Sequence, residues 1–133
     1  MRFQIRYTLI KSFRKGRSEG VFYFDTRHFS RRTDENQIHR ATLGNWQFYF
    51  YRTQVGAEVD LVLISPAGKM TCIEIKYSLA PTLAKGFYQS IADLKPHYQY
   101  VIIPSGTPYF LNEQLKVCSL SDFLNIELAL VHG

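Results

Sequence analysis

Three charged side chains stand inside two otherwise apolar segments of this 133-residue sequence. Asp60 lies in the segment Val-Asp-Leu-Val-Leu-Ile, and Glu74 and Lys76 lie in Met-Thr-Cys-Ile-Glu-Ile-Lys. Charged groups inside apolar strands need partners or a function. Two carboxylates suit a hard divalent cation such as Mg²⁺ or Mn²⁺, and a neighbouring lysine can orient or deprotonate water and offset phosphate charge. These residue types therefore favour metal-dependent hydrolysis of a phosphodiester.

The spacing of the two segments predicts an antiparallel hairpin that brings these groups together. If Ile64 pairs with Met70 across a turn marked by Pro66 and Gly68, then Asp60 stands opposite Glu74, with Cβ atoms about 4.5–5.5 Å apart. Since side chains alternate between the faces of a strand, two sets are each expected to share a face. They are Glu58, Asp60, Val62 and Ile64 on the first strand, and Met70, Cys72, Glu74 and Lys76 on the second.

Opposed carboxylates repel each other, and a divalent cation between them would remove the repulsion. The same register sets Glu58 opposite Lys76, so we interpret Glu58 as a partner of that lysine or a solvated neighbour rather than a metal ligand. A purely structural interpretation stays open, because alternating charges on a solvated strand face also produce the Glu-x-Lys pattern.

Periodicity predicts the elements that must position these residues. Asp34 caps a short helix that runs to about Leu43, with Glu35 in its first turn, where the helix dipole favours an acid. Strands then follow over 46–52, 57–64 and 70–77, a helix over 81–94 with Leu83, Phe87, Ile91 and Leu94 on one buried face, and a buried strand over 100–103. A short strand near Val117 and a terminal helix capped by Ser119 or Ser121 complete the chain. This order predicts an α/β fold with a mixed central sheet.

A basic, β-rich stretch precedes this core. Alternating apolar residues from Phe3 to Leu9 predict a strand, Lys11–Gly20 an exposed loop, and Val21–Phe24 a second strand. Residues 1–53 hold eleven of the sixteen basic residues, including all nine arginines, against four acids, whereas residues 54–133 hold five lysines against seven acids. A basic half suits phosphate recognition, although a solvated basic surface remains the alternative. The candidate phosphate contacts are Arg14, Lys15, Arg17, Arg31, Arg32 and Arg40.

Other function classes find little support. Hydrophobic residues make up 46% of the chain, which excludes wholesale disorder. Cys72 and Cys118 lie in no zinc or disulfide pattern, and the four histidines are scattered. The apolar runs are too short to span a membrane, and the N-terminus does not read as a secretory signal, so a cytoplasmic protein without a membrane partner is expected. No GxxxxGK[ST] loop for ATP occurs.

Several strings of this sequence resemble one family. They are Phe50 to Leu63, Ile73-Glu-Ile-Lys-Tyr-Ser, Lys85-Gly86, Asp93-Leu-Lys-Pro, Tyr100-Val-Ile-Ile-Pro and Leu120-Ser-Asp-Phe-Leu. Together they resemble the C-terminal domain of unknown function attached to a group of prokaryotic AAA-type ATPases, which is similar to the restriction-endonuclease-like PD-(D/E)xK superfamily. The resemblance covers most of the chain from Val21 onward. It implies a restriction-endonuclease-like core of helix, three-strand antiparallel meander, helix and strand.

The resemblance also assigns roles to residues. Asp60 would be the motif aspartate, Glu74 the second acid and Lys76 the motif lysine. Metal would be held by Asp60, Glu74, the backbone carbonyl of Ile75 and Glu35, although Glu35 could equally be a plain helix N-terminal acid. Residues 34–133 would form the nuclease-like domain, and residues 1–33 a basic N-terminal extension that remains from the linker to an ATPase.

The function expected from these observations is Mg²⁺- or Mn²⁺-dependent hydrolysis of nucleic-acid phosphodiesters, with DNA favoured over RNA as the substrate. The alternative is a catalytically inactive module that binds nucleic acid or protein and retains the nuclease fold. Because the chain carries no ATPase motif, a separate ATPase or another protein is an expected partner. Exposed edge strands and the aromatic segment from Trp46 to Tyr51 suggest a homodimer.

Overall fold

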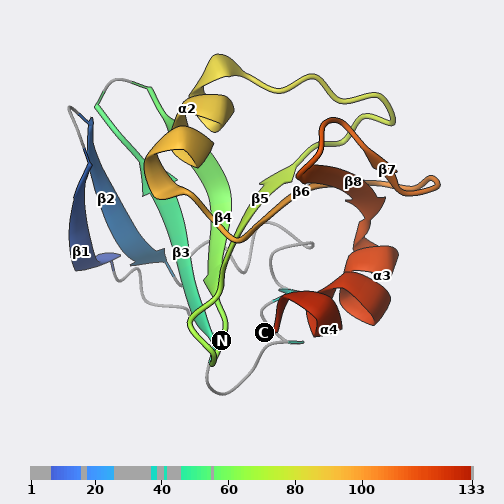
Figure 1. Ribbon diagram of the computed structural model, residues 1–133, viewed down its shortest axis with the longest axis horizontal. Helices are drawn as coiled ribbons and strands as arrows, with labels where there is room; N and C mark the ends of the chain where they lie inside the picture. The colour runs from blue at the N-terminus through green and yellow to red at the C-terminus, as the bar shows by residue number, and fades with distance from the viewer. Residues whose placement is uncertain are drawn as a thin grey trace.

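The computed structural model is built around one eight-stranded mixed sheet, with helices on both of its faces (Figure 1). The structure describes residues 7–15, 18–25, 37–38, 41, 46–54 and 56–132, of which 7–15, 18–25 and Phe50 are described by their backbone. Spatial strand order is β1-β2-β3-β4-β5-β6-β8-β7. Neighbours from β1 to β5 are antiparallel, β5, β6 and β8 are mutually parallel, and β7 is antiparallel to β8. The predicted α/β class with a mixed sheet is confirmed.

The eight strands are β1 (Tyr7–Lys15), β2 (Ser18–Asp25), β3 (Gln47–Arg52), β4 (Glu58–Ile64), β5 (Met70–Ile75), β6 (Tyr98–Ile103), β7 (Tyr109–Phe110) and β8 (Leu115–Ser119). The predicted strands from β3 to β6 and β8 are present with small shifts in their bounds. The two-residue β7 has no counterpart in the sequence-based prediction. Within the predicted first helix, Gln37, Ile38 and Ala41 are helical, and the rest of it lies outside the described residues.

The hairpin of β4 and β5 has the predicted register, with Ile64 opposite Met70. Its turn is closed by a hydrogen bond from Gly68 N–H to the carbonyl of Ser65 at 2.8 Å, and Lys69 N–H donates to Ser65 Oγ at 3.1 Å. Gly68 has φ +83°, a conformation that glycine adopts without a steric penalty. The turn chemistry and the apolar alternation therefore fix the same pairing.

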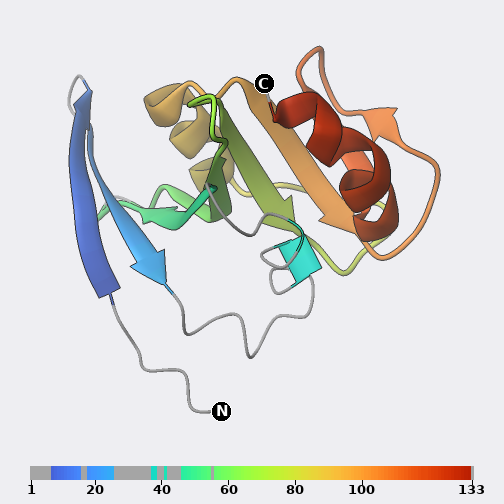
Figure 2. The ribbon, with the colours of Figure 1, turned by 90° about the horizontal axis from the view of Figure 1, so that it is seen from below.

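Alternating side chains of the central strands feed two separate cores. Val62, Cys72 and Val101 pack beneath the helix α2 (Lys85–Leu94), whereas Leu63, Ile73 and Ile102 pack beneath the C-terminal helical segment. That segment comprises α3 (Leu120–Asp122), the π-helix η2 (Phe123–Glu127) and α4 (Leu128–Val131). Figure 2 shows α2 and the C-terminal helices on opposite sides of the sheet. The inner strands are therefore buried on both faces, as their continuous apolar sequences predict.

The start of α2 sits unusually close to the loop that precedes β4. A Cβ atom at Gly86 would lie 2.3 Å from the carbonyl oxygen of Gly56. Only a residue without a side chain fits there, so Gly86 sets the approach of α2 to β4. The predicted buried face of the helix is confirmed, because Phe87 and Leu94 are buried and Leu83 and Ile91 pack against the same core.

Two predictions about the N-terminal half are wrong. The expected loop over Lys11–Gly20 is a hairpin, since β1 continues to Lys15 and β2 begins at Ser18. Strands pair through main-chain N–H and C=O groups, so pairing can extend through polar residues. A prediction based on alternating apolar residues does not detect such strand segments. The aromatic segment is not exposed either: Phe48, Tyr49 and Tyr51 are buried, since β3 lies between β2 and β4. This segment therefore offers no support for a homodimer.

Within the described residues, none of the helices combines the length and apolarity needed to cross a membrane. Ser119 caps the C-terminal helical segment, since its Oγ accepts a hydrogen bond from Asp122 N–H at 3.1 Å, which confirms one of the two predicted caps. Cys72 and Cys118 are buried free thiols.

Candidate functional site

Asp60 and Glu74 lie on adjacent antiparallel strands, at the end of the hairpin distant from its turn. The paired residues run from Ile64 and Met70 to Leu61 and Ile73, so Asp60 and Glu74 are the next positions along the two strands. Glu74 follows Cys72 on the α2 face of the sheet, because Ile73 belongs to the opposite core. The two side chains therefore lie where β4 begins and β5 ends, in the interior of the sheet order.

An irregularity in β4 aims the Asp60 side chain. Tyr49 pairs with Val62 but Tyr51 pairs with Val59, so two residues of β4, Asp60 and Leu61, face a single residue of β3. Because of this bulge, Val59 and Val62 pack in the same core although they are three residues apart. Bulges locally break the ladder and redirect side chains, and they are frequent beside functional sites. The expectation of one shared face from Glu58 to Ile64 is wrong for this reason.

The Asp60 carboxylate reaches across to the backbone of β5. Ile75 N–H donates a hydrogen bond to Asp60 Oδ2 at 2.9 Å, beyond the last backbone pair of the two strands. The next amide, Lys76 N–H, donates to the Ile102 carbonyl of β6 at 2.9 Å. In a strand the N–H and C=O of one residue face the same neighbour, so the Ile75 carbonyl also faces β4. One carboxylate and one carbonyl therefore converge on the gap between the strands.

Glu74 is 8% exposed, and its pKa is affected by the charges of both Asp60 and Lys76. Burial raises the pKa of the Glu74 carboxyl to about 8, with further upward contributions from its hydrogen bond with Asp60 and from the Asp60 charge. Lys76 acts in the opposite direction, because its positive charge favours the ionised carboxylate. The sequence predicts that Asp60, Glu74 and Lys76 lie close together. The contributions of Asp60 and Lys76 to the pKa of Glu74 are consistent with this placement.

Glu58 takes no part in this cluster. Its Oε1 accepts a hydrogen bond from Arg52 Nη2 at 3.0 Å, and both side chains are largely exposed. Arg52 is its direct neighbour on β3. Of the two interpretations of Glu58, the pairing with Lys76 is wrong, because the bulge in β4 turns Glu58 toward the other neighbouring strand, and the solvated neighbour is confirmed.

The donor set fits a small hard cation. Two carboxylates lie beside a backbone carbonyl, and oxygen ligands of this kind suit Mg²⁺ and Mn²⁺, which retain several waters. Across the part of the chain that the structure describes, no group of three or more His, Cys, Asp and Glu side chains is placed to hold a metal. Among the described residues, the groups that could hold such a cation are the Asp60 and Glu74 carboxylates and the Ile75 carbonyl.

Most of the other predicted residues lie outside the described part. These are Glu35, the further metal ligand, and the phosphate contacts Arg17, Arg31, Arg32 and Arg40. Arg14 and Lys15 are placed by their backbone at the end of β1, where they pair with Glu19 and Ser18 of β2.

A buried polar network that sequence reasoning missed ties α2 to the sheet. Tyr51 Oη donates a hydrogen bond to Asp93 Oδ2 at 3.2 Å, and Gln89 Nε2 donates to Asp93 Oδ1 at 3.1 Å. Burial, followed by the Asp93 charge, raises the pKa of Tyr51, so the hydroxyl remains a donor. Gln89 is itself exposed and joins the network from the outer side of α2. In the sequence, the one sign of this network is Asp93, an acidic residue on the apolar face of an amphipathic helix.

Comparison with known proteins gives one match. A family model described as a domain of unknown function (DUF4143) matches residues 35–123, about two thirds of the chain. The matched region contains Asp60, Glu74 and Lys76 as well as Glu35. No curated protein and no solved structure matches the chain.

Proposed function

The chain belongs to the DUF4143 family, a domain of unknown function, and we propose that it is a metal-dependent nuclease-like domain that hydrolyses nucleic-acid phosphodiesters, DNA in preference to RNA. One observation carries the proposal: Asp60 and Glu74 occupy adjacent positions on β4 and β5 beyond their last paired residues, and the charge of Lys76 acts on Glu74 there. A restriction-endonuclease-like core would present its site at this point. The order β3-β4-β5, α2, β6 agrees with that proposal.

A structural role accounts poorly for this arrangement. Adjacent carboxylates on neighbouring strands are destabilising, and a buried Glu74 adds a desolvation cost. The raised pKa of Glu74 means that a proton offsets one of the two charges at neutral pH. A divalent cation would offset both charges and let Glu74 ionise.

Each residue then has a defined task. The Asp60 and Glu74 carboxylates and the Ile75 carbonyl would hold Mg²⁺ or Mn²⁺, with Glu35 as the further ligand that the family resemblance implies. When bound, the ion supplies positive charge that polarises the phosphodiester and lowers the pKa of a coordinated water. Lys76, half-buried beside Glu74, would orient the attacking water and offset the negative charge that develops on the phosphate.

The basic N-terminal half would bind the nucleic-acid backbone. Residues 1–53 carry a formal charge of +7, and residues 54–133 carry −2. Backbone contacts position a substrate without reading its sequence. DNA is the proposed partner. The proposed phosphate contacts are Arg14 and Lys15 on β1 and, later in the basic half, Arg17, Arg31, Arg32 and Arg40. A separate ATPase or another protein remains a proposed second partner.

A second candidate function is a catalytically inactive module that binds nucleic acid or protein. The observation that favours it is the small donor set: two carboxylates, without a third acid among the residues that the structure describes. Loss of catalysis with retention of the fold would leave the basic surface as the functional feature.

Titration calorimetry with Mn²⁺ separates the two candidates. We expect the wild-type chain to take up Mn²⁺, Asp60→Ala to lose this uptake, and Glu58→Ala to retain it, since Glu58 is a nearby exposed carboxylate paired with Arg52. Lys76→Met should bind Mn²⁺ but fail to cleave a DNA substrate that the wild type cleaves. Absence of uptake in the wild type, or equal uptake in Asp60→Ala, would reject the nuclease and favour the binding module.

A further inference from the structure

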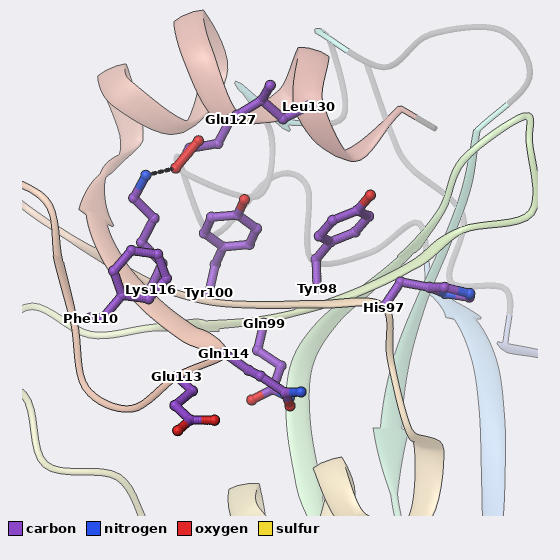
Figure 3. Close-up of a pocket in the computed structure, with 10 residues that line it drawn as sticks. All are labelled: His97, Tyr98, Gln99, Tyr100, Phe110, Glu113, Gln114, Lys116, Glu127 and Leu130. Atoms are coloured by element: carbon purple, nitrogen blue, oxygen red, sulfur yellow. Dashed lines mark hydrogen bonds and ion pairs between the residues drawn. The ribbon is translucent and has the colours of Figure 1, made fainter.

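A cleft of about 350 Å³ lies at the beginning of β6 and β8, which are the second and third strands from β4 in the sheet (Figure 3). Three residues on adjacent strands form a row across its floor: Tyr100 on β6 pairs with Lys116 on β8, and Phe110 on β7 pairs with the same Lys116. Tyr100 belongs to the core beneath the C-terminal helices, on the face opposite to α2. The cleft is therefore separate from the cluster at Asp60 and Glu74.

A buried charge pair forms one wall of the cleft. Lys116 Nζ makes an ion pair with Glu127 Oε1, and Lys116 Nζ also lies 5.5 Å from the centre of the Phe110 ring. Glu127 is 2% exposed, and its second carboxylate oxygen, Oε2, accepts no hydrogen bond from another described residue. A buried carboxylate with unused acceptor capacity is costly in a native structure. Glu127 Oε2 therefore has acceptor capacity left for a donor from a bound molecule.

The backbone that carries Glu127 is itself unusual. Glu127 ends the five-residue π-helix η2, between the short helices α3 and α4. Short π-helical segments are rare and often occur at functional sites. In Figure 3 the Glu127 side chain extends from this segment toward Lys116 and lies above Tyr100.

Two tyrosine hydroxyls point to the same space. Tyr98 and Tyr100, two residues apart on β6, both project toward the C-terminal helices in Figure 3. Burial, with a further contribution from the Glu127 charge, raises the pKa of Tyr100, so its hydroxyl stays protonated and able to donate. Phe110, which is 60% exposed, adds an accessible ring at the rim. Hydrogen-bond donors, an acceptor and flat apolar surfaces therefore line one cleft.

The pairing of Lys116 with Glu127 selects the charge of the ligand. A cationic group would meet the Lys116 ammonium, and an anion would meet the Glu127 carboxylate, so each would be repelled by one member of the pair. A neutral molecule with a donor beside an acceptor satisfies both, and aromatic walls favour a planar ring. We propose that this cleft binds a neutral planar heterocycle with a ring N–H next to a carbonyl, the lactam edge of a uracil or guanine base.

In this arrangement the ring N–H donates to Glu127 and the adjacent carbonyl accepts from Lys116 or a tyrosine hydroxyl. In nucleic-acid complexes lysine donates to the O6 carbonyl of guanine, and glutamate accepts from N–H groups on base edges. The Phe110 and Tyr98 rings contact the faces of the base, an interaction that tolerates any base and so leaves selectivity to the charge pair. The inference goes beyond the proposed function, because it uses none of the residues proposed for hydrolysis.

Titration of the full chain with uridine and 3-methyluridine tests this proposal. Calorimetry or ligand-observed NMR should show uridine binding, with at least about tenfold weaker binding of 3-methyluridine, whose ring N–H donor is blocked. Glu127→Gln should weaken uridine binding by a similar factor. Since this variant alters a buried charge pair, Phe110→Ala at an exposed position provides a second test, and it should also weaken binding. Tyr88→Ala, an exposed residue on the opposite face, should leave it unchanged.

Equal binding of uridine and 3-methyluridine, no uridine binding, or binding unaffected by both Glu127→Gln and Phe110→Ala would overturn the proposal. A ten-residue oligouridylate identifies the source of the base. Tighter binding of the oligonucleotide, still weakened by Phe110→Ala, assigns the cleft to bases within a strand. Equal affinity for uridine assigns it to free nucleosides. Mn²⁺ uptake at Asp60 is measured separately, so either proposal can fail alone.

Discussion

The Asp60 carboxylate occupies the place of a backbone partner for Ile75, because Ile75 N–H donates to Asp60 Oδ2 at 2.9 Å where the paired residues of β4 and β5 have ended. A side chain rather than a main-chain carbonyl thus satisfies this amide. The consequence is that Asp60 has two separable properties, its shape as an acceptor and its charge.

Substitutions at Asp60 should separate these properties. Asp60→Asn retains an oxygen that can accept from Ile75 N–H, so we expect its free energy of unfolding to stay within about 0.5 kcal/mol of the wild type, whereas Asp60→Ala should lose about 1–2 kcal/mol. Urea unfolding in the presence of EDTA measures both. Both variants should lose Mn²⁺ uptake. Equal stability of Asp60→Ala and Asp60→Asn would show that the Ile75 contact contributes nothing.

Stability in the absence of metal should fall as the pH rises through the neutral range. The folded Glu74 carboxyl has its pKa raised to about 8 from an ordinary 4.5, so between these values the folded chain holds a proton that the unfolded chain has released. Stability therefore decreases with pH there, by up to about 1.4 kcal/mol per unit, and levels off above pH 8.

Unfolding of the wild type and of Glu74→Gln, at pH values from 5 to 9 in EDTA, checks this dependence. The difference between the two proteins should move in favour of Glu74→Gln as the pH rises, because glutamine does not titrate. A constant difference across the range would mean that Glu74 ionises normally in the folded protein.

Gly86→Ala should destabilise the protein although alanine is the better helix former. The added Cβ would lie 2.3 Å from the Gly56 carbonyl oxygen, a backbone atom that cannot rotate away, so α2 must shift. We expect a loss of about 1–3 kcal/mol, against the gain of about 1 kcal/mol that propensity alone predicts. Thermal unfolding gives the sign, with Ala84→Gly just before the helix as a control for general sensitivity of this segment. A stabilised Gly86→Ala would refute the close approach.

Lys116 and Glu127 should be strongly coupled in stability. Lys116→Met leaves the Glu127 carboxylate buried without its ion-pair partner and should cost about 3–5 kcal/mol. The double variant with Glu127→Gln should recover most of this loss, because two neutral groups then replace the pair. Denaturant unfolding of the four proteins in a double-mutant cycle measures the coupling, and additive losses would contradict it.

The sequence predicted the central elements well because local signals agreed there. In the hairpin of β4 and β5, the apolar alternation, the proline and the glycine at Gly68 all favoured one register, and Ile64 does pair with Met70. The amphipathic spacing from Leu83 to Leu94 likewise predicted the buried face of α2.

What the sequence did not reveal depends on contacts between segments. The bulge at Asp60 arises from the register of β3 against β4, and a strand sequence gives no sign of where its partner slips. The close approach of Gly86 to Gly56 and the hydrogen bond from Tyr51 to Asp93 join residues about thirty or more positions apart. The strand pattern also failed for β1 and β2, since polar residues there join the ladder through their main chains.

The two ends of the sheet differ in how much open main chain they expose. β7, at one end, is two residues long, so it offers almost no template for a strand from another molecule. β1, at the other end, is nine residues long and carries an irregularity between Leu9 and Lys11, with three basic residues from Lys11 to Lys15. Association of two molecules through pairing of their edge strands is therefore limited at the first end because β7 is so short. At the second end it is limited by a kink and by like-charge repulsion, which high salt would weaken.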